Sequence, residues 1–359
     1  MRVLIAGGGT GGHIIPALAI ARELRDAYGA EVRFVGTARG LETKLVPEAG
    51  FPLELIRVGQ LKNVSLATRL RTLADLPLGV MRCVGLVRDF RPDVVVGVGG
   101  YASGPAMMAA ILLRVPTLAF EPNAVPGLAN RLVGKRVSAA AVNFEETRRY
   151  FRNARVTGIP VRREFFEIAE KPAGSTQKLL VFGGSQGARI FNQVMPKIAK
   201  SLIEEIPGLR ILHQAGATFA ETVEAAYAAG GADATRWEVA AFLDDMPRRF
   251  ADADLILCRS GASTVAELAA AGKAALLVPL PTAADNHQLK NAEVLRAAGA
   301  AELRVQSGDE AMESFLASDL SELLRDSQRR VEMGRRVRGL AHPDAVREIG
   351  AMVAGLGRV

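Results

Sequence analysis

The chain has 359 residues, of which 49% are hydrophobic and only 5% aromatic, and it carries a formal net charge of +7. This length and hydrophobic content exclude a disordered chain and predict a large core divided over two domains. The basic balance with few aromatic rings favours an anionic ligand or surface over base stacking on nucleic acid, and the two distant cysteines, Cys83 and Cys258, exclude a disulfide framework.

Apolar runs alternate with helical patterns along the first half of the chain. We expect strands in RVLIAG at 2–7, EVRFVG at 31–36, DVVVGVGG at 93–100 and PTLAF at 116–120. Helices are predicted over about 14–28 and from about Pro105. The alternation is typical of a parallel sheet that is covered on both faces.

Two apolar segments of the first half must be weighed as targeting or membrane signals. The apolar start at 3–7 is too short for a signal peptide, so we expect a cytoplasmic protein. The segment 94–113 is uncharged, but four glycines and Pro105 interrupt it. It therefore indicates a strand, a loop and a helix instead of a membrane span.

The second half repeats the scheme. Strands are expected in KLLVFGG at 178–184, RILHQ at 210–214, ADLILC at 253–258 and AALLVPL at 274–280, with helices over about 188–205 and 263–271. The segment 157–165 lies between the halves, and Gly158 and Pro160 break any element there. Helical patterns fill 309–359, and Pro343 separates the last helix. We predict an α/β protein of two Rossmann-like, doubly wound domains that face each other across a cleft.

A glycine-rich turn, GGGTGGH at 7–13, follows the first strand. Gly7, Gly9 and Gly12 satisfy the dinucleotide fingerprint, but the acid that this fingerprint requires after the second strand is replaced by Gly36 and Thr37. The turn predicts a phosphate or backbone approach near a helix N-terminus, or only tight packing. His13 at its mouth is a candidate general base for a bound hydroxyl, or a neutral imidazole that closes the first helical turn.

Two more loops leave the same sheet edge. GGYASGP at 99–105 repeats the strand, loop and helix plan. FEPNAVPGLANR at 120–131 contains Glu121, Asn123 and Asn130. Because ligands bind at the carboxyl ends of parallel strands, these polar loops are expected to converge on one wall of a binding site.

The second half has corresponding loops. GGSQGAR at 183–189 follows the first strand of this half, and in CRSGASTVAEL at 258–268 the amides of 262–264 are placed to face a diphosphate. Glu267 could accept hydrogen bonds from ribose hydroxyls, and the alternative is a capping box between Thr264 and Glu267. The loop at 279–293 suits a polyhydroxylated ligand such as a sugar.

Metal chemistry has little support in the sequence. Asp252 and Asp254 spell DxD, but they precede a strand and are expected at the sheet edge opposite the glycine turns. Cysteines and histidines form no cluster. We expect no metal site and no cofactor.

Eight ordered motifs resemble the MurG family of peptidoglycan glycosyltransferases, over essentially the whole chain. They are GGTGGH at 8–13, GGYASGP, EPNAVPGL, GIPVR at 158–162, GGSQGAR, FLDDM at 242–246, RSGASTVAE and the NHQ loop at 286–288. The resemblance implies a GT-B fold and inverting transfer of N-acetylglucosamine from UDP to the muramoyl C4 hydroxyl of undecaprenyl-pyrophosphoryl-muramoyl-pentapeptide. It also implies that residues 1–161 with helix 343–359 bind the acceptor and that 162–342 bind the UDP-sugar.

The resemblance implies roles for single residues as well. Thr10, Gly11 and Gly12 would lie near the diphosphates, Asn123 near the sugar, and Arg162 and Ser185 on the donor. Leu243 would contact uracil through its backbone, Ala262, Ser263 and Thr264 the α-phosphate, Glu267 the ribose, and Gln288 sugar hydroxyls. An inverting displacement needs one base, for which His13 is the first candidate and Glu121 and Asn123 are the neighbouring ones.

The segment from Leu61 to Phe90 mixes apolar residues with lysine and arginine. Such a face suits an anionic membrane surface, although an amphipathic helix pair packed on the sheet would look the same. We expect a peripheral protein on the cytoplasmic face of the inner membrane, with no nucleic-acid partner. A UDP-N-acetylglucosamine 2-epimerase of the same fold and a non-catalytic nucleotide-sugar-binding protein are the alternative functions.

Overall fold

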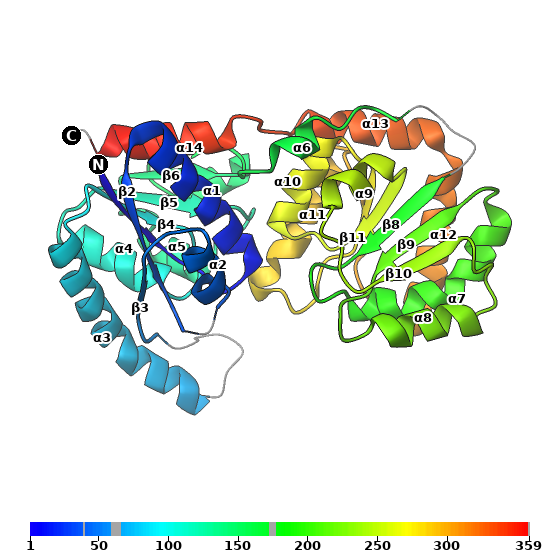
Figure 1. Ribbon diagram of the computed structural model, residues 1–359, viewed down its shortest axis with the longest axis horizontal. Coiled ribbons are helices and arrows are strands. Elements are labelled where there is room, and N and C mark those ends of the chain that lie inside the picture. Colours follow the sequence, from blue (N-terminus) through cyan, green and yellow to red (C-terminus); the bar gives the residue numbers. More distant parts are fainter. Residues whose placement is uncertain (39, 59–65, 172–176, 358–359) are drawn as a thin grey trace. The chain divides into compact units, whose positions relative to one another are not determined.

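The computed structural model describes residues 1–38, 40–58, 66–171 and 177–357, with the backbone alone for 66–75. The chain divides into two compact units. Unit 1 contains Met1–Pro160 and Asp344–Val359, and unit 2 contains Val161–Pro343. Each unit has its own parallel sheet (Figure 1).

Unit 1 is built on a seven-stranded parallel sheet with the order β3-β2-β1-β4-β5-β6-β7. Its strands are β1 (Arg2–Ala6), β2 (Glu31–Gly36), β3 (Leu53–Leu55), β4 (Val94–Gly97), β5 (Thr117–Glu121), β6 (Ala139–Val142) and β7 (Ala154–Val156). Its helices are α1 (Gly11–Tyr28), α2 (Glu42–Glu48), α3 (Leu66–Phe90), α4 (Ser103–Leu112), α5 (Leu128–Val133), the 3₁₀ helix η1 (Glu145–Tyr150) and α14 (Ala345–Leu356).

Helices cover both faces of this sheet, because alternate residues of its strands are buried on opposite sides. Leu4, Val95 and Ala119 face a core formed with α3, α4 and α5. On the other side α14 lies beside α1 and contacts β4 and β5 (Figure 1). The helix α14, near the end of the chain, thus covers a face of the sheet that contains the first strand.

Unit 2 repeats the plan with six parallel strands in the order β10-β9-β8-β11-β12-β13. Its strands are β8 (Lys178–Phe182), β9 (Arg210–Gln214), β10 (Trp237–Ala240), β11 (Leu255–Cys258), β12 (Ala275–Leu277) and β13 (Glu302–Leu303). Its helices are α6 (Arg163–Phe166), α7 (Arg189–Glu205), α8 (Ala220–Ala229), α9 (Met246–Asp252), α10 (Ala262–Ala271), η2 (Ala284–Asn286), α11 (His287–Ala297), α12 (Asp309–Arg325) and α13 (Ser327–Arg338).

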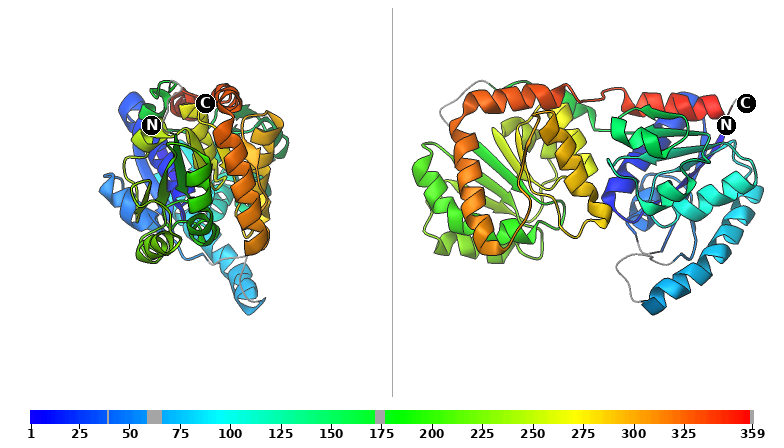
Figure 2. Two further views of the ribbon diagram at one scale, coloured as in Figure 1. Left: turned by 90° about the vertical axis from the view of Figure 1, so that its right-hand side faces the viewer. Right: turned by 180° about the vertical axis from the view of Figure 1, so that it is seen from behind.

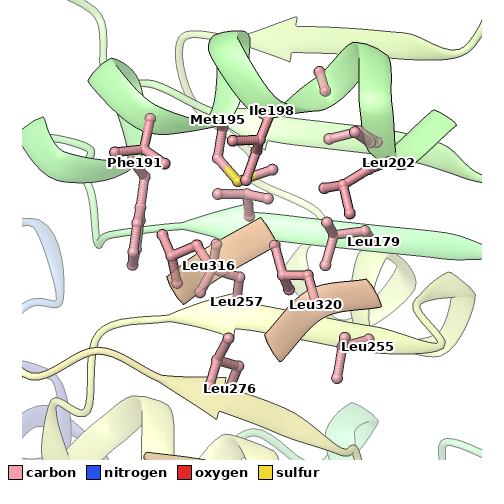
Figure 3. Packing of buried hydrophobic residues seen from close by; sticks show 14 of the residues in the cluster. Leu179, Phe191, Met195, Ile198, Leu202, Leu255, Leu257, Leu276, Leu316 and Leu320 are labelled. Carbon is pink, nitrogen blue, oxygen red and sulfur yellow. The ribbon is translucent and has the colours of Figure 1, made fainter. Parts of the chain in front are cut away.

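A hydrophobic core of unit 2 lies between its sheet and the pair α7 and α12. Figure 3 shows Phe191 and Met195 of α7 and Leu316 of α12 packed against Leu179 and Leu257 of the strands. The view from behind in Figure 2 shows α12 lying over this face of the sheet. Burial of each such side chain contributes about 1.5–3 kcal/mol, so this packing holds the strand ends rigidly in place.

Both units have the strand order of a doubly wound Rossmann sheet, as predicted. The direction of winding reverses between β1 and β4 in unit 1 and between β8 and β11 in unit 2. In sheets of this kind ligands bind outside the carboxyl ends of the strands at this switch point. The loops that follow β1, β4, β8 and β11 are therefore the first places to look for a site.

Candidate functional site

The two loops at the switch point of unit 1 touch each other through their glycines. A Cβ atom on Gly7 would lie 2.4 Å from the carbonyl oxygen of Gly99, and one on Gly100 would lie 2.3 Å from that of Gly8. Both Gly99 and Gly100 have positive φ, near 90° and 81°. The predicted glycine turns are thus needed here for close backbone contact as well as for their conformation.

His13 lies at this junction, in the first turn of α1. Its backbone N–H donates to the carbonyl oxygen of Thr10 at 3.1 Å, and its Nδ1 lies 3.3 Å from the Thr10 hydroxyl. The other ring nitrogen, Nε2, lies against Gly99, where a Cβ atom would be only 2.9 Å away. The half-buried imidazole is therefore held between both loops. Thr10, Gly11 and Gly12 form the start of the same helix.

Glu121 ends β5 and is only 2% exposed. Its Oε1 accepts hydrogen bonds from the backbone and side-chain amides of Asn123, and its Oε2 accepts from the Gly127 amide and the Asn130 side chain. Burial raises the pKa of Glu121, although these donors lower it in part. The carboxylate holds the loop after β5 in shape, and Asn123, half-buried, lies within that loop.

Of the unit 2 residues that we predict to bind the donor, Ala262, Ser263 and Thr264 begin α10, directly after β11 at the β8/β11 switch point. α10 has Gly261 as its N-cap, and its first intrahelical bond runs from the Val265 amide to the Gly261 carbonyl. The amides of Ala262, Ser263 and Thr264 precede that bond and form a helix N-terminus suited to an anion. No side chain caps α10, so the alternative of a capping box between Thr264 and Glu267 is wrong.

Glu267 lies half-buried in α10, one turn further along. Burial raises its pKa to about 7, and the charge of Arg162 offsets part of that rise. Arg162 itself is exposed just before α6, with its guanidinium 5.2 Å from the centre of the Phe165 ring. The structure thus brings together Glu267 and Arg162, which are far apart in the sequence.

Gln214, which sequence reasoning missed, joins the loops that follow β8 and β10. Its Nε2 donates to the Gly184 carbonyl at 2.8 Å, and its Oε1 accepts from the Leu243 amide at 3.2 Å. The N–H of Leu243 is therefore already bonded within the protein. The predicted backbone contact of Leu243 with uracil would have to use the Leu243 carbonyl oxygen. Ser185 is exposed beside Gly184. The position of Gln214 at the end of β9 was the available signal.

Gln288 lies in the first turn of α11. Its Oε1 accepts from the Leu280 amide at 3.0 Å, and its carbonyl accepts from the buried Ser260 hydroxyl at 2.8 Å. Arg259, also missed, is 8% exposed and donates to the carbonyls of Val278 and Pro279. Burial lowers the pKa of Arg259 to about 10, which still leaves the guanidinium charged at neutral pH, 5.3 Å from the centre of the Phe191 ring.

The DxD aspartates, Asp252 and Asp254, lie directly before β11, as predicted. Asp254 pairs with Lys171 at 2.6 Å and Asp252 with Lys178 at 3.1 Å. Across the described part of the chain, no three His, Cys, Asp or Glu side chains cluster as metal ligands would.

Comparison with known proteins gives consistent relatives. The family models described as glycosyltransferase family 28 N-terminal and C-terminal domains match residues 3–142 and 178–349. The UDP-N-acetylglucosamine–N-acetylmuramyl-(pentapeptide) pyrophosphoryl-undecaprenol N-acetylglucosamine transferase of Solibacter usitatus is 45% identical over 96% of this chain and 93% of its own length. The transferase of the same name from Anaeromyxobacter dehalogenans is 45% identical over 97% of this chain and 91% of its own.

Solved structures agree. The crystal structure of MurG from Acinetobacter baumannii is 31% identical, covers 99% of both chains and superposes with a TM-score of 0.80. A UDP-N-acetylglucosamine 2-epimerase, 15% identical over 97% of this chain and 94% of its own, reaches a TM-score of 0.64. At that identity the epimerase shares the fold alone.

Proposed function

The chain belongs to the MurG family of glycosyltransferases, and from this membership we propose that it transfers N-acetylglucosamine from UDP-N-acetylglucosamine to undecaprenyl-pyrophosphoryl-muramoyl-pentapeptide in peptidoglycan synthesis. The observation that carries the proposal is the 45% identity, over 96% of the chain, to a transferase named for this reaction. The switch-point loops of both units supply the chemistry that the reaction needs.

We assign the donor to unit 2. The diphosphate binds at the amides of Ala262, Ser263 and Thr264, where the helix N-terminus favours negative charge. Glu267 accepts hydrogen bonds from the ribose, Gln288 binds sugar hydroxyls, and Leu243 contacts the uracil. Arg162 and Ser185 also contact the donor. The positive charge of Arg162 stabilises the negative charge that develops on the leaving diphosphate.

The acceptor is assigned to unit 1, with His13 as the general base. The muramoyl C4 hydroxyl loses its proton to His13 while its oxygen forms a bond to C1 of N-acetylglucosamine. The bond from C1 to the diphosphate oxygen breaks, and its electron pair leaves with UDP. One displacement inverts the configuration at C1 and needs no enzyme nucleophile. Thr10, Gly11 and Gly12 bind near the acceptor diphosphate, and Asn123 binds near the sugar.

Glu121 takes a supporting part in this proposal. Its buried carboxylate already accepts four hydrogen bonds from its own loop. A group so engaged is poorly placed to remove a proton from a hydroxyl, which is why His13 is preferred. We propose that Glu121 holds Asn123 in position for the acceptor.

A peripheral position on the cytoplasmic face of the inner membrane fits unit 1. No described helix has both the length and the apolar character that a membrane crossing needs. Leu78 and Met81 of α3 are 64% and 69% exposed, and Leu112 of α4 and Leu132 of α5 are 67% and 56% exposed. α4 contacts both α3 and α5. These helices and the residues just after them carry exposed arginines, at Arg82, Arg88, Arg114, Arg131 and Arg136.

Apolar side chains flanked by arginines suit an anionic lipid surface that also holds the acceptor. Within the segment predicted for this role, residues 61–65 and the side chains of 66–75 lie outside the described residues. The proposal therefore rests on the second half of α3 and on α4 and α5.

The experiment that tests the function supplies UDP-N-acetylglucosamine with a soluble analogue of the lipid acceptor and identifies all products by mass spectrometry and NMR. Transfer to the muramoyl sugar is the expected result. Conversion of the donor to its C2 epimer without acceptor would favour the epimerase, and binding of UDP with no turnover would favour a non-catalytic protein.

A further inference from the structure

We infer that Glu42 is a positioning residue for His13, and that its carboxylate acts as a built-in anion for the first glycine loop. Glu42 is the first residue of α2 and comes six residues after Gly36, the last residue of β2. The inference rests on the proposed function in one respect, the role of His13 in the reaction. The contacts that carry it lie entirely within unit 1.

Three hydrogen bonds hold the Glu42 carboxylate, which is 1% exposed. Its Oε2 accepts from the Gly9 amide at 2.7 Å. Its Oε1 accepts from the backbone amide of Thr37 at 2.9 Å and from the Thr37 hydroxyl at 3.0 Å. One side chain thereby ties the loop after β1 to the end of β2.

Glycines from three segments leave room for this carboxylate. A Cβ atom would lie 2.4 Å from the Glu42 side chain if placed on Gly8, 2.6 Å if placed on Gly36, and closer still if placed on Gly40. Such distances are far below van der Waals contact, so any larger residue would expel the carboxylate. Glycine at these positions therefore makes room for the Glu42 side chain.

The charge state of Glu42 fits an anion. Burial alone would raise its pKa, but the hydrogen bonds from Gly9 and Thr37 outweigh burial and lower the pKa below its ordinary value. All three partners are donors, and a carboxylate offers acceptors only. The ionised form is the one that the loop binds.

Glu42 reaches His13 through Gly9 and Thr10. The Gly9 carbonyl accepts from the Leu41 amide at 3.3 Å, so residues 41 and 42 hold both polar groups of the Gly9 backbone. The next residue, Thr10, supplies the carbonyl that accepts the first bonds of α1, from the amides of His13 and Ile14. Its hydroxyl lies beside His13 Nδ1. A shift of Gly9 would therefore move the start of α1 and the imidazole with it.

The arrangement also changes what the loop can bind. In a dinucleotide site the second glycine of the fingerprint lets the backbone approach a pyrophosphate. Here that glycine is Gly9, and its amide already donates to a carboxylate. The acid that the sequence lacks directly after β2 is thus replaced by one from α2, which points inward to the loop instead of outward to a ribose.

The test compares Glu42→Gln with Val46→Ala as a matched control. Val46 lies one turn along α2 and is equally buried, at 0% exposure, but it does not touch the glycine loop through a polar group. Glu42→Gln keeps the size of the side chain and presents an NH₂ group to at least one donor. We expect kcat to fall about 10- to 100-fold, because misplacing a catalytic group by about 1 Å has that effect.

The KM for UDP-N-acetylglucosamine and the affinity for UDP should stay unchanged in Glu42→Gln, because the donor residues lie in unit 2. The NMR resonances of the Gly9 amide and the His13 ring should move. Val46→Ala should lower thermal stability without these effects. If Glu42→Gln does not fold, Thr37→Val, which removes one of the three bonds, should show the same pattern with a smaller loss.

A Val46→Ala protein that loses kcat as Glu42→Gln does would overturn the inference, since α2 packing would then explain both. So would a Glu42→Gln or Thr37→Val protein with wild-type kcat and an unmoved His13 resonance. If the wild type transfers no sugar, the proposed function fails, but the Gly9 and His13 resonances still decide whether Glu42 positions His13.

Discussion

Glu121 and Asn123 are joined by two hydrogen bonds to one oxygen: the backbone amide of Asn123 donates to Oε1 of Glu121 at 3.0 Å, and its side-chain amide donates at 3.1 Å. The acid therefore sets both the backbone and the side chain of the neighbour that we assign to the acceptor sugar. In this account Glu121 holds the loop in shape, and Asn123 is the residue of the loop that contacts the sugar.

Glu121→Ala is expected to destabilise the protein by about 2–4 kcal/mol, because the amides of Asn123, Gly127 and Asn130 lose a buried acceptor. Asn123→Ala should cost less, about 0.5–1.5 kcal/mol for loss of its side-chain hydrogen bond to Glu121, because the backbone bond to Glu121 remains. Urea denaturation measures both. An inactive Glu121→Ala protein with wild-type stability would point to direct chemistry by Glu121 instead.

His13→Ala is expected to lower the transfer rate about 100- to 10,000-fold, the usual range for loss of a general base. UDP binding, measured by calorimetry, should be unchanged because we assign the donor to residues of unit 2. Thr10→Val removes the hydroxyl beside Nδ1 but keeps the ring, so it should lower the rate by less than His13→Ala does. A folded His13→Ala protein that works at the wild-type rate would remove His13 from the mechanism.

UDP affinity is expected to fall as the pH drops below about 7, where Glu267 takes up a proton. In our assignment the ionised carboxylate accepts hydrogen bonds from both ribose hydroxyls, whereas the protonated acid has less acceptor capacity. In Glu267→Gln, affinity should be weak and should lose this pH dependence. Arg162→Ala should move the midpoint upward, because the charge of Arg162 lowers the pKa of Glu267. An unmoved midpoint would contradict the pairing.

The stability of the ligand-free protein should respond to Glu267 in the opposite sense. Its pKa is raised in the folded state, so its contribution is fully present below the unfolded pKa and is lost as the pH rises through about 7. Glu267→Gln should therefore be more stable than the wild type at about pH 8, by on the order of 1–3 kcal/mol, with the difference fading toward about pH 5. Urea denaturation at both pH values measures this difference, and a destabilised variant at the higher pH would refute it.

Replacement of Leu78 and Met81 by serine should reduce co-sedimentation with vesicles that contain anionic lipid, because both side chains are largely exposed on α3. Phe219→Ser is the matched control, since Phe219 is 48% exposed and belongs to unit 2. Charge reversal at Arg82 should reduce vesicle binding further. This additional loss should be smaller at high salt, because salt screens the interaction with anionic lipid. Equal binding by all the variants would count against this surface.

The fold was predictable because its central strands are short, continuous apolar runs followed by glycine turns. The run EVRFVG became β2 without change of bounds, and RILHQ became β9. The prediction omitted edge strands such as β3 and β13, which have two or three residues and carry glutamates at Glu54 and Glu302. At a sheet edge, pairing with one neighbour is enough to make a strand of such a sequence, so hydrophobic patterning does not reveal it.

The site was predictable in its loops but not in its internal bonds. Glycines and polar residues at strand ends identified the loops of His13, Glu121 and Glu267. Glu42 and Gln214 were missed because each acts at a distance in sequence, on Gly9 and on Gly184, and no spacing rule links them. Likewise, the engagement of Glu121 by its own loop depends on how residues 122–130 fold back, which a single sequence does not show.

The most direct measurement of the central claim is the anomeric configuration of the sugar transferred to a lipid-acceptor analogue, determined by NMR of the purified product. The account predicts a β-linked N-acetylglucosamine on the muramoyl C4 oxygen, formed from the α-linked donor in one inverting displacement. An α-linked product would contradict a single inverting displacement, and with no linked product at all the proposed transfer would be refuted.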